Sequence, residues 1–423
     1  MSDQVATGPH VLRRINISAV LGALRAAEDA TARVSDLMAA TGLSRPAVTR
    51  ALAALGRAGV VEFLDAEPTA LGRPAARARF RAELGHVAGI DIGPRTMTVA
   101  IADLSGAVRA HRRLATPPEP TGPRLVELMR SGLEELAQEA GVPVGSLWAV
   151  GLGTPGIVDH ERGVVVVAPS IPGWTGLPML SGLRDWLGCP VLIDNDVNLA
   201  VLAERQVGAV GAAGTTMLYV HWGERIGAGL VVDGKPYRGA SSAAGELGFL
   251  DLLTPVDDTP PGVAGGLGPF ERLAGAAEIR RLAGIDDGIV TSDPADRAEA
   301  DRADRADANS TERADPTDRA DLRPFFDAIA SGEPAAMAVL DRVAGRFARG
   351  LAAMVLMLDP GRVVIGGGLA HGGDVLLDAV RRRLEPLLLV PCEVRLSALR
   401  ENAVALGAVR MALDHAEQRL TDM

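Results

Sequence analysis

The chain has 423 residues, of which 48% are hydrophobic and 23% charged, so it can bury the cores of two or three domains. It has neither an apolar run long enough to span a membrane nor a signal-peptide pattern, and we expect a cytoplasmic protein. Two isolated cysteines, Cys189 and Cys392, exclude a disulfide framework and a cysteine-rich metal site. Residues 1–85 have a net charge of +3 and the remainder −13, which suggests that only the N-terminal end meets a polyanion.

The first 60 residues have the apolar spacing of three short helices joined by tight turns. Ser44 is placed to cap the third helix, and only residues 42–44 separate that helix from the second, as in a helix-turn-helix. Arg45, Thr49 and Arg50 then lie near the exposed start of the third helix, where such motifs contact bases and phosphates. Together with Ser44 they are the predicted major-groove contacts.

Two strands follow, at residues 60–64 and 77–81, and are predicted to form a β-wing. Its tip carries Arg73 between a glycine and a proline, and a guanidinium on so slim a turn suits the narrow minor groove of A·T-rich DNA. Three short helices can also be a plain packing module, and the tip an ordinary turn. The agreement of helix order, tight turn, exposed arginines and wing favours a winged helix-turn-helix DNA-binding domain over residues 1–83.

From residue 86 the chain alternates between apolar strands and helices, which is typical of an α/β fold. Several predicted strands end in glycine or an acidic residue, the types that let a backbone approach a phosphate or hold a metal-bound phosphate. These strand ends include Asp91-Ile92-Gly93, Asp194-Asn195-Asp196, the segment Gly223 to Gly229, and Gly366-Gly367-Gly368. Each motif alone is a weak signal, and only their order is specific.

In this order the motifs resemble those of the ROK family, which groups sugar-responsive repressors with sugar kinases. The resemblance covers about residues 86–285 and 323–415. It implies an α/β, actin-like fold of two lobes, as in sugar kinases and Hsp70-type ATPases, with sugar held between the lobes. The winged helix-turn-helix in front resembles the repressor branch. We therefore expect a ROK domain over residues 86–423.

The resemblance also implies a sugar site. Asp196 matches the aspartate that takes a proton from the sugar hydroxyl in the kinases, and Asn195 matches an asparagine that bonds to the sugar. Glu246 and Glu271 match two glutamates that accept hydrogen bonds from sugar hydroxyls. From the residues alone, any of residues 194–196 could instead be the N-cap of the helix that follows, and Glu271 a carboxylate at a helix start.

A nucleotide site of the family is matched only in part. The matching positions are Asp91, Gly93, Gly223, Gly227 and Gly367. Pro94 and Arg95 stand where the family commonly has Gly-Thr, and Glu224 and Arg225 where it has Thr and Gly. A carboxylate beside a triphosphate adds repulsion, and proline removes an N–H donor, so both changes argue against tight ATP binding. We expect these positions to be a vestigial nucleotide site.

The zinc site of the family is also unmatched. The positions that correspond to its one histidine and three cysteine ligands are Phe249, Gly262, Ala264 and Pro269. None of these residue types coordinates zinc. We expect no metal, no cofactor and no catalytic residue, with Asp196 as the remnant of a base.

Residues 286–321 repeat Ala-Asp-Arg units with almost no large apolar side chain. Such a segment has nothing to bury and is predicted to be a solvated, flexible insertion in the ROK domain. A salt-bridged surface helix is the competing interpretation, since Asp and Arg recur closely.

Taken together, the sequence predicts a DNA-binding transcription regulator, with repression favoured, that acts as a homodimer or higher homo-oligomer. Its partners would be double-stranded operator DNA, read by two heads about 34–36 Å apart, and a sugar or sugar phosphate effector. The alternative is an ATP-dependent sugar kinase of the glucokinase or fructokinase type with an added DNA-binding domain. A third hypothesis is a regulator that binds no small molecule.

Overall fold

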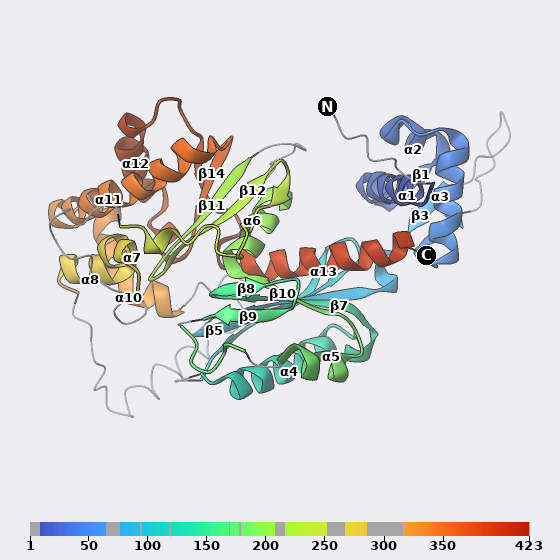
Figure 1. Ribbon diagram of the computed structural model, residues 1–423, viewed down its shortest axis with the longest axis horizontal. Coiled ribbons are helices and arrows are strands. Elements are labelled where there is room, and N and C mark those ends of the chain that lie inside the picture. The colour runs from blue at the N-terminus through green and yellow to red at the C-terminus, as the bar shows by residue number, and fades with distance from the viewer. Residues whose placement is uncertain are drawn as a thin grey trace.

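The computed structural model describes residues 9–64, 77–93, 95–117, 120–168, 170–176, 179–207, 216–251, 267–285 and 316–422. A small head precedes two α/β lobes, lobe I below and lobe II at the upper left in Figure 1. The predicted α/β, actin-like architecture with a preceding helix-turn-helix domain is confirmed. Four residues discussed above, Arg73, Pro94, Gly262 and Ala264, lie outside the described residues, as does segment 286–315.

The head combines three helices with a three-stranded antiparallel sheet in the order β1-β3-β2. Its apolar side chains, such as Ile17, Leu37 and Leu52, are buried, as their helical spacing predicts. The elements of the head are α1 (Pro9–Ala26), β1 (Thr31–Arg33), α2 (Val34–Thr41), α3 (Arg45–Arg57), β2 (Val61–Leu64) and β3 (Arg77–Phe80). The short strand β1 is an addition that the sequence pattern did not predict.

The start of α3 differs from the prediction in one respect. Ser44 is the N-cap residue, but its side chain makes no capping hydrogen bond. Pro46 has no N–H to offer, and the N–H groups of Ala47 and Val48 donate to the Ser44 carbonyl oxygen at 2.9 and 3.0 Å. The predicted side-chain cap is therefore wrong, and α3 begins with backbone bonds alone.

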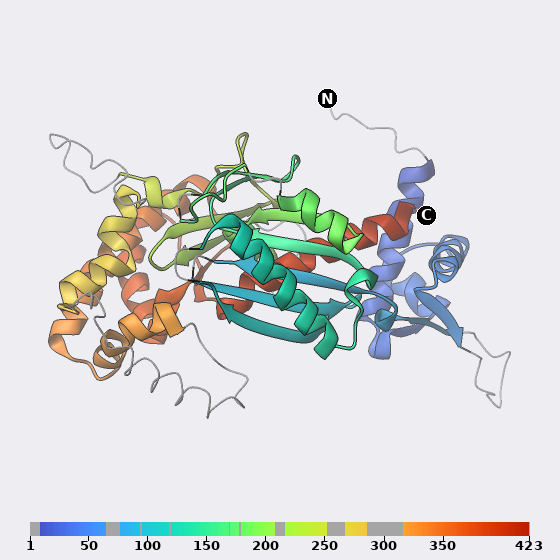
Figure 2. The same ribbon diagram turned by 90° about the horizontal axis from the view of Figure 1, so that it is seen from below.

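Lobe I is built on a five-stranded sheet in the order β10-β7-β4-β5-β6. Strands β4, β5 and β6 form an antiparallel meander, and β7 and β10 are added in parallel. Helices α4 and α5 cover one face of the sheet, as the view from below shows (Figure 2). The bounds are β4 (His86–Ile92), β5 (Thr96–Asp103), β6 (Val108–Ala115), α4 (Gly122–Glu139), β7 (Leu147–Thr154), the hairpin β8 (Ile157–Asp159) and β9 (Val164–Val167), α5 (Met179–Leu187) and β10 (Val191–Asn195).

Lobe II repeats this topology in the order β15-β14-β11-β12-β13. Again three strands form an antiparallel meander, and two more are added in parallel. The bounds are β11 (Met217–Trp222), β12 (Ile226–Val232), β13 (Lys235–Pro236), α7 (Pro269–Ala274), α8 (Ala276–Ala283), α10 (Pro316–Ala330), α11 (Pro334–Leu358), β14 (Arg362–Gly366), α12 (Gly373–Leu384) and β15 (Val394–Leu396). Helix α10 begins at Pro316, so the last residues of the predicted flexible insertion are helical.

Two helices, α6 (Asp196–Val207) and α13 (Ala403–Asp422), cross between the lobes. They pack against each other, and a Cβ on Gly407 of α13 would lie 1.9 Å from the carbonyl oxygen of Leu199 in α6. Helix α13 also lies on β4 and β7, where Gly89 and Gly151 face its backbone. Glycine on three neighbouring elements therefore allows α13 to approach so closely.

Helix α13 also joins the head to lobe I. Figure 1 shows it running from between the lobes to the head, where the C-terminus lies. Arg25 of α1 forms an ion pair with Glu417 of α13, and its guanidinium lies 4.8 Å above the ring of Phe80. Buried side chains of the head, β5 and α13 form one hydrophobic cluster. The head and lobe I therefore share a core.

Candidate functional site

The residues at the end of β10 are fixed by the start of α6. The Asn195 side-chain oxygen accepts hydrogen bonds from the N–H groups of Val197 at 3.0 Å and Asn198 at 3.3 Å, which makes Asn195 the N-cap of α6. Its side-chain nitrogen donates to the carbonyl oxygen of Gly156 at 2.8 Å. This is the helix-cap alternative considered above, and a sugar contact by Asn195 stays a prediction.

Asp194 is buried and paired with an arginine of the other lobe. Its side chain is 1% exposed and accepts two hydrogen bonds from the guanidinium of Arg238, at 2.9 and 2.5 Å. Arg238 follows β13, so the pair joins the ends of two edge strands, β10 of lobe I and β13 of lobe II. The other carboxylate oxygen accepts from the N–H of Asn195 and the amide of Asn198. Arg238 thereby holds the β10–α6 junction, a role that the sequence pattern did not assign.

Asp196 and Glu246 approach each other from the two lobes. Burial raises the pKa of Asp196, and His221 opposes the shift. Burial also raises the pKa of Glu246, and the charges of Asp196 and Glu271 add to that shift. Carboxylates with raised pKa values gather at functional sites. We call the following five residues the interlobe site: Asp196, His221, Arg225, Glu246 and Glu271.

Replacing Asp196 with asparagine is expected to stabilise the unliganded protein at pH 7. Because the folded-state pKa is raised, the folded protein binds more protons than the unfolded chain between the two pKa values, and its stability falls as pH rises through that window. Each unit of raised pKa corresponds to about 1.4 kcal/mol. The variant lacks this cost, so its advantage should grow from about pH 4, near the unfolded-state pKa, towards neutral pH.

Unfolding of the wild type and Asp196→Asn across this pH range checks the expectation, with Asp185→Asn on the exposed side of α5 as control. A variant that is less stable than the wild type at pH 7 would contradict it.

Glu271 is 3% exposed, and backbone groups bind both of its oxygens. One oxygen accepts from the N–H of Ile226 at 3.0 Å and the other from the N–H of Gly268 at 2.7 Å. The guanidinium of Arg225 lies 3.7 Å from the second oxygen. Glu271 thus fixes the start of α7 against β12, as the helix-start alternative expects, and a sugar hydroxyl would have to share its oxygens.

The head presents its predicted DNA contacts on one exposed face. Ser44, Arg45, Thr49 and Arg50 are exposed, whereas the alternating apolar residues of α3, such as Val48, are buried. Arg77 and Arg79 are exposed on the wing strand β3, and Arg79 pairs with Glu62 at 2.5 Å. The structure therefore brings together the predicted contacts that it describes.

Residues 87–415 match the sequence model of the ROK family, and this match spans both lobes. The chain belongs to the ROK family. Residues 16–65, which lie within the head, match the IclR helix-turn-helix domain.

This ROK chain is similar both to kinases and to repressors. It is 28% identical to the glucokinase of Thermotoga maritima, over 76% of this chain and 95% of the relative. It is 27% identical to a putative xylose repressor of a Caldicellulosiruptor species, over 78% of each chain. A solved ROK family transcriptional regulator, a homologue of the E. coli Mlc protein, matches with a TM-score of 0.73 at 18% identity, over 98% of this chain and 99% of its own. That likeness shows a shared fold with the head included.

In the turn between β11 and β12, the two residues predicted to depart from the ROK pattern both have partners of opposite charge. Glu224 forms an ion pair with Arg280 of α8 at 2.8 Å, and Arg225 reaches towards Glu271. The turn itself is closed by a hydrogen bond from the N–H of Gly223 to the carbonyl oxygen of Arg225 at 3.0 Å. Glu224 therefore places a paired carboxylate beside the matched glycines.

The other matched nucleotide positions lie at strand ends or against strands. Gly367 has φ of +85°, and a Cβ there would meet the backbone of Trp222 at 2.7 Å. Gly227 faces Val197 of α6, and the N–H of Gly93 donates to the carbonyl oxygen of Thr96. Burial raises the pKa of Tyr219 on β11, and the charges of Glu204, Asp196 and Asp91 add to that shift, which places Asp91 near the Tyr219 hydroxyl. Their role as a vestigial nucleotide site stays a prediction.

The described part of the chain contains neither a candidate metal site nor a candidate transmembrane helix. No group of three or more His, Cys, Asp or Glu side chains lies close enough there to hold a metal ion. No described helix combines the length and the apolar character needed to cross a bilayer.

Proposed function

We propose that this ROK protein is a transcriptional repressor whose affinity for double-stranded operator DNA changes when a sugar or sugar phosphate binds at the interlobe site. It acts as a homodimer, or a higher homo-oligomer, in the cytoplasm, where operator and effector meet. The observation that carries the proposal is the exposed start of α3 on a head that is packed onto lobe I. The similarity to xylose repressors supports it.

The structure offers a physical route from effector to DNA. The interlobe site lies at the N-terminus of α6, α6 packs along α13, and α13 contacts α1 of the head. A ligand that binds the two lobes more tightly in one relative position shifts the population towards that position, by no more than its difference in affinity. Such coupling is typically about 1–3 kcal/mol.

The test starts from duplexes selected from a random pool by the purified protein. Binding of the selected duplex is measured at fixed salt with and without a panel of pentoses, hexoses and their phosphates, since affinity for DNA depends strongly on salt. We expect one effector to weaken binding roughly 5- to 150-fold. No preference among duplexes, or no change with any sugar, would contradict the proposal.

Replacing Arg45 or Arg50 with alanine is expected to weaken binding of the selected duplex by about 1–3 kcal/mol each, because residues at the start of a recognition helix contact base edges. Arg57→Ala, at the far end of α3, is the matched control and should leave the affinity near that of the wild type. Fluorescence anisotropy with the selected duplex measures all three variants. Equal losses in all three would indicate general charge attraction instead of base reading.

The second candidate function is an ATP-dependent sugar kinase. Asp196, at the start of α6 with a raised pKa, has the character of a general base, and the similarity to glucokinases favours this candidate. A coupled assay with ATP, Mg²⁺ and the same sugars separates the two functions. Phosphorylation that Asp196→Asn abolishes would establish the kinase and reject our expectation that the chain is not an enzyme.

A further inference from the structure

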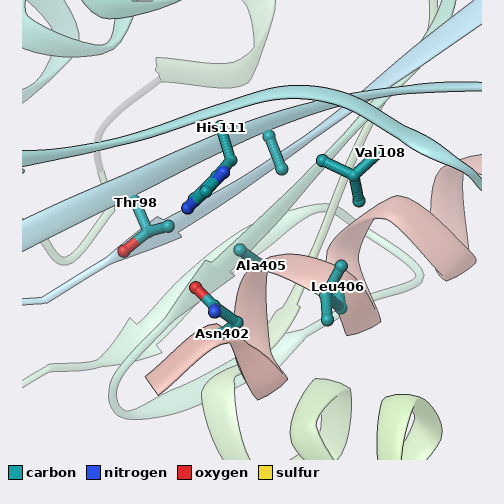
Figure 3. A pocket seen from close by; sticks show the side chains of 7 residues that line it. Thr98, Val108, His111, Asn402, Ala405 and Leu406 are labelled. Carbon is teal, nitrogen blue, oxygen red and sulfur yellow. The ribbon is translucent and has the colours of Figure 1, made fainter. Parts of the chain in front are cut away.

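A hollow of about 210 Å³ lies on lobe I, between the strands β5 and β6 and the start of α13. None of the residues of the interlobe site lines it. Figure 3 shows Thr98, His111 and Asn402 at one end of the hollow and Val108 and Leu406 at the other. It is therefore a separate place on the molecule with a polar end and an apolar end.

The polar end is formed by three side chains that make no hydrogen bond to the residues that the structure describes. Thr98 is only 5% exposed, yet its hydroxyl makes no hydrogen bond to any residue that the structure describes. The side chains of His111 and Asn402 likewise make none within the described residues. Oγ1 of Thr98 is not among the fully buried atoms without a partner, and His111 and Asn402 are exposed, so water can reach all three groups. A bound molecule must therefore offer them the hydrogen bonds that it takes from water.

The chemistry of these three groups defines the ligand. A hydroxyl and a carboxamide can each both donate and accept a hydrogen bond, and an imidazole adds two ring nitrogens, so together they match the hydroxyl groups of a polyol. No Asp, Glu, Lys or Arg lines the hollow, so a charged ligand would find no counter-charge there. The polar end therefore suits an uncharged, hydroxylated molecule.

The apolar end suits the carbon skeleton of such a molecule. Ala100 and Ala405 are buried, and Val108 is 41% exposed at the rim. The volume is that of roughly seven water molecules at ~30 Å³ each, which limits the ligand to a small polyol or a monosaccharide. We infer that this hollow is a binding site for a small uncharged polyol, distinct from the interlobe site and independent of the proposed function.

Two variants test the site in different ways. Thr98→Val keeps the shape of the side chain and removes the hydroxyl, and Val108→Trp fills the hollow from its exposed rim. Val164→Trp replaces a valine of similar exposure, 37%, on β9 and is the matched control. Asp196→Asn is the control for binding at the interlobe site.

Isothermal titration calorimetry with glycerol, erythritol and xylitol, and with acetate and phosphate as charged probes, measures binding to the full-length protein. We expect at least one uncharged probe to bind the wild type, with affinity at least 10-fold lower in Thr98→Val and Val108→Trp and unchanged in both controls. No binding by any uncharged probe would overturn the inference, as would binding that survives Val108→Trp or is lost in Asp196→Asn. If Val108→Trp instead changes the oligomeric state in sedimentation, the hollow is a contact between copies and the inference is wrong.

Discussion

Replacing Arg238 with alanine is expected to destabilise the protein by about 3–5 kcal/mol, the cost of leaving a buried charge without its partner. The side chain of Asp194 is 1% exposed and that of Arg238 19%, so little water can replace the guanidinium. The same carboxylate holds the backbone of Asn195, and its loss of orientation would loosen the N-terminus of α6. Chemical denaturation at neutral pH measures the change in the free energy of unfolding.

The pair Arg383 and Asp341 provides a matched control. Here too an arginine donates from two nitrogens to an aspartate, but the side chain of Arg383 is 49% exposed and that of Asp341 45%. Arg383→Ala is expected to destabilise the protein far less than Arg238→Ala, because solvent screens the exposed pair. The double variant Asp194→Asn with Arg238→Gln removes both charges and should recover part of the loss. Equal effects of Arg238→Ala and Arg383→Ala would contradict the role given to burial.

Replacing Gly151 with alanine is expected to destabilise the protein by at least about 3 kcal/mol or to prevent folding, because the added Cβ would lie 2.1 Å from the carbonyl oxygen of Ala408. The obstacle is backbone, so α13 would have to lift from β7. Hydrogen exchange across α13 and the midpoint of unfolding together report the change.

Gly22 on α1 is the matched control for this substitution. A Cβ there would meet no atom within 4 Å, and alanine is favoured over glycine inside a helix by up to about 1 kcal/mol. Gly22→Ala should therefore leave the protein as stable as the wild type or more so. If Gly151→Ala is as stable as Gly22→Ala, glycine does not set the position of α13.

The parts that the sequence predicts well are those with local patterns. Helical spacing in the first 60 residues predicts the head, and apolar runs that end at Asp91, Asp194 and Gly366 predict β4, β10 and β14. The order of motifs also predicts the family and the two-lobed fold. These features depend on neighbours in sequence, which periodicity and motif spacing can detect.

The parts that the sequence does not predict depend on contacts between distant residues. The pair of Asp194 with Arg238 spans 44 positions, and that of Arg25 with Glu417 spans 392. The two sheets have the same topology, but the sequence pattern did not predict this repeat. At Ser44 the failure is local: the proline at position 46 takes away a donor that a side-chain cap would use.

The shared core of the head and lobe I limits how a signal can reach DNA. Side chains of the head are buried against α13 and β5, so we expect the head and lobe I to move together as one rigid body. A ligand that closes or opens the two lobes would then leave the structure of α3 unchanged. It would change only the distance and orientation of α3 relative to the α3 helix of a second chain. Under the proposed function, the effector should not change the affinity for a single half-site. It should change the affinity only for a palindromic operator to which two chains bind together.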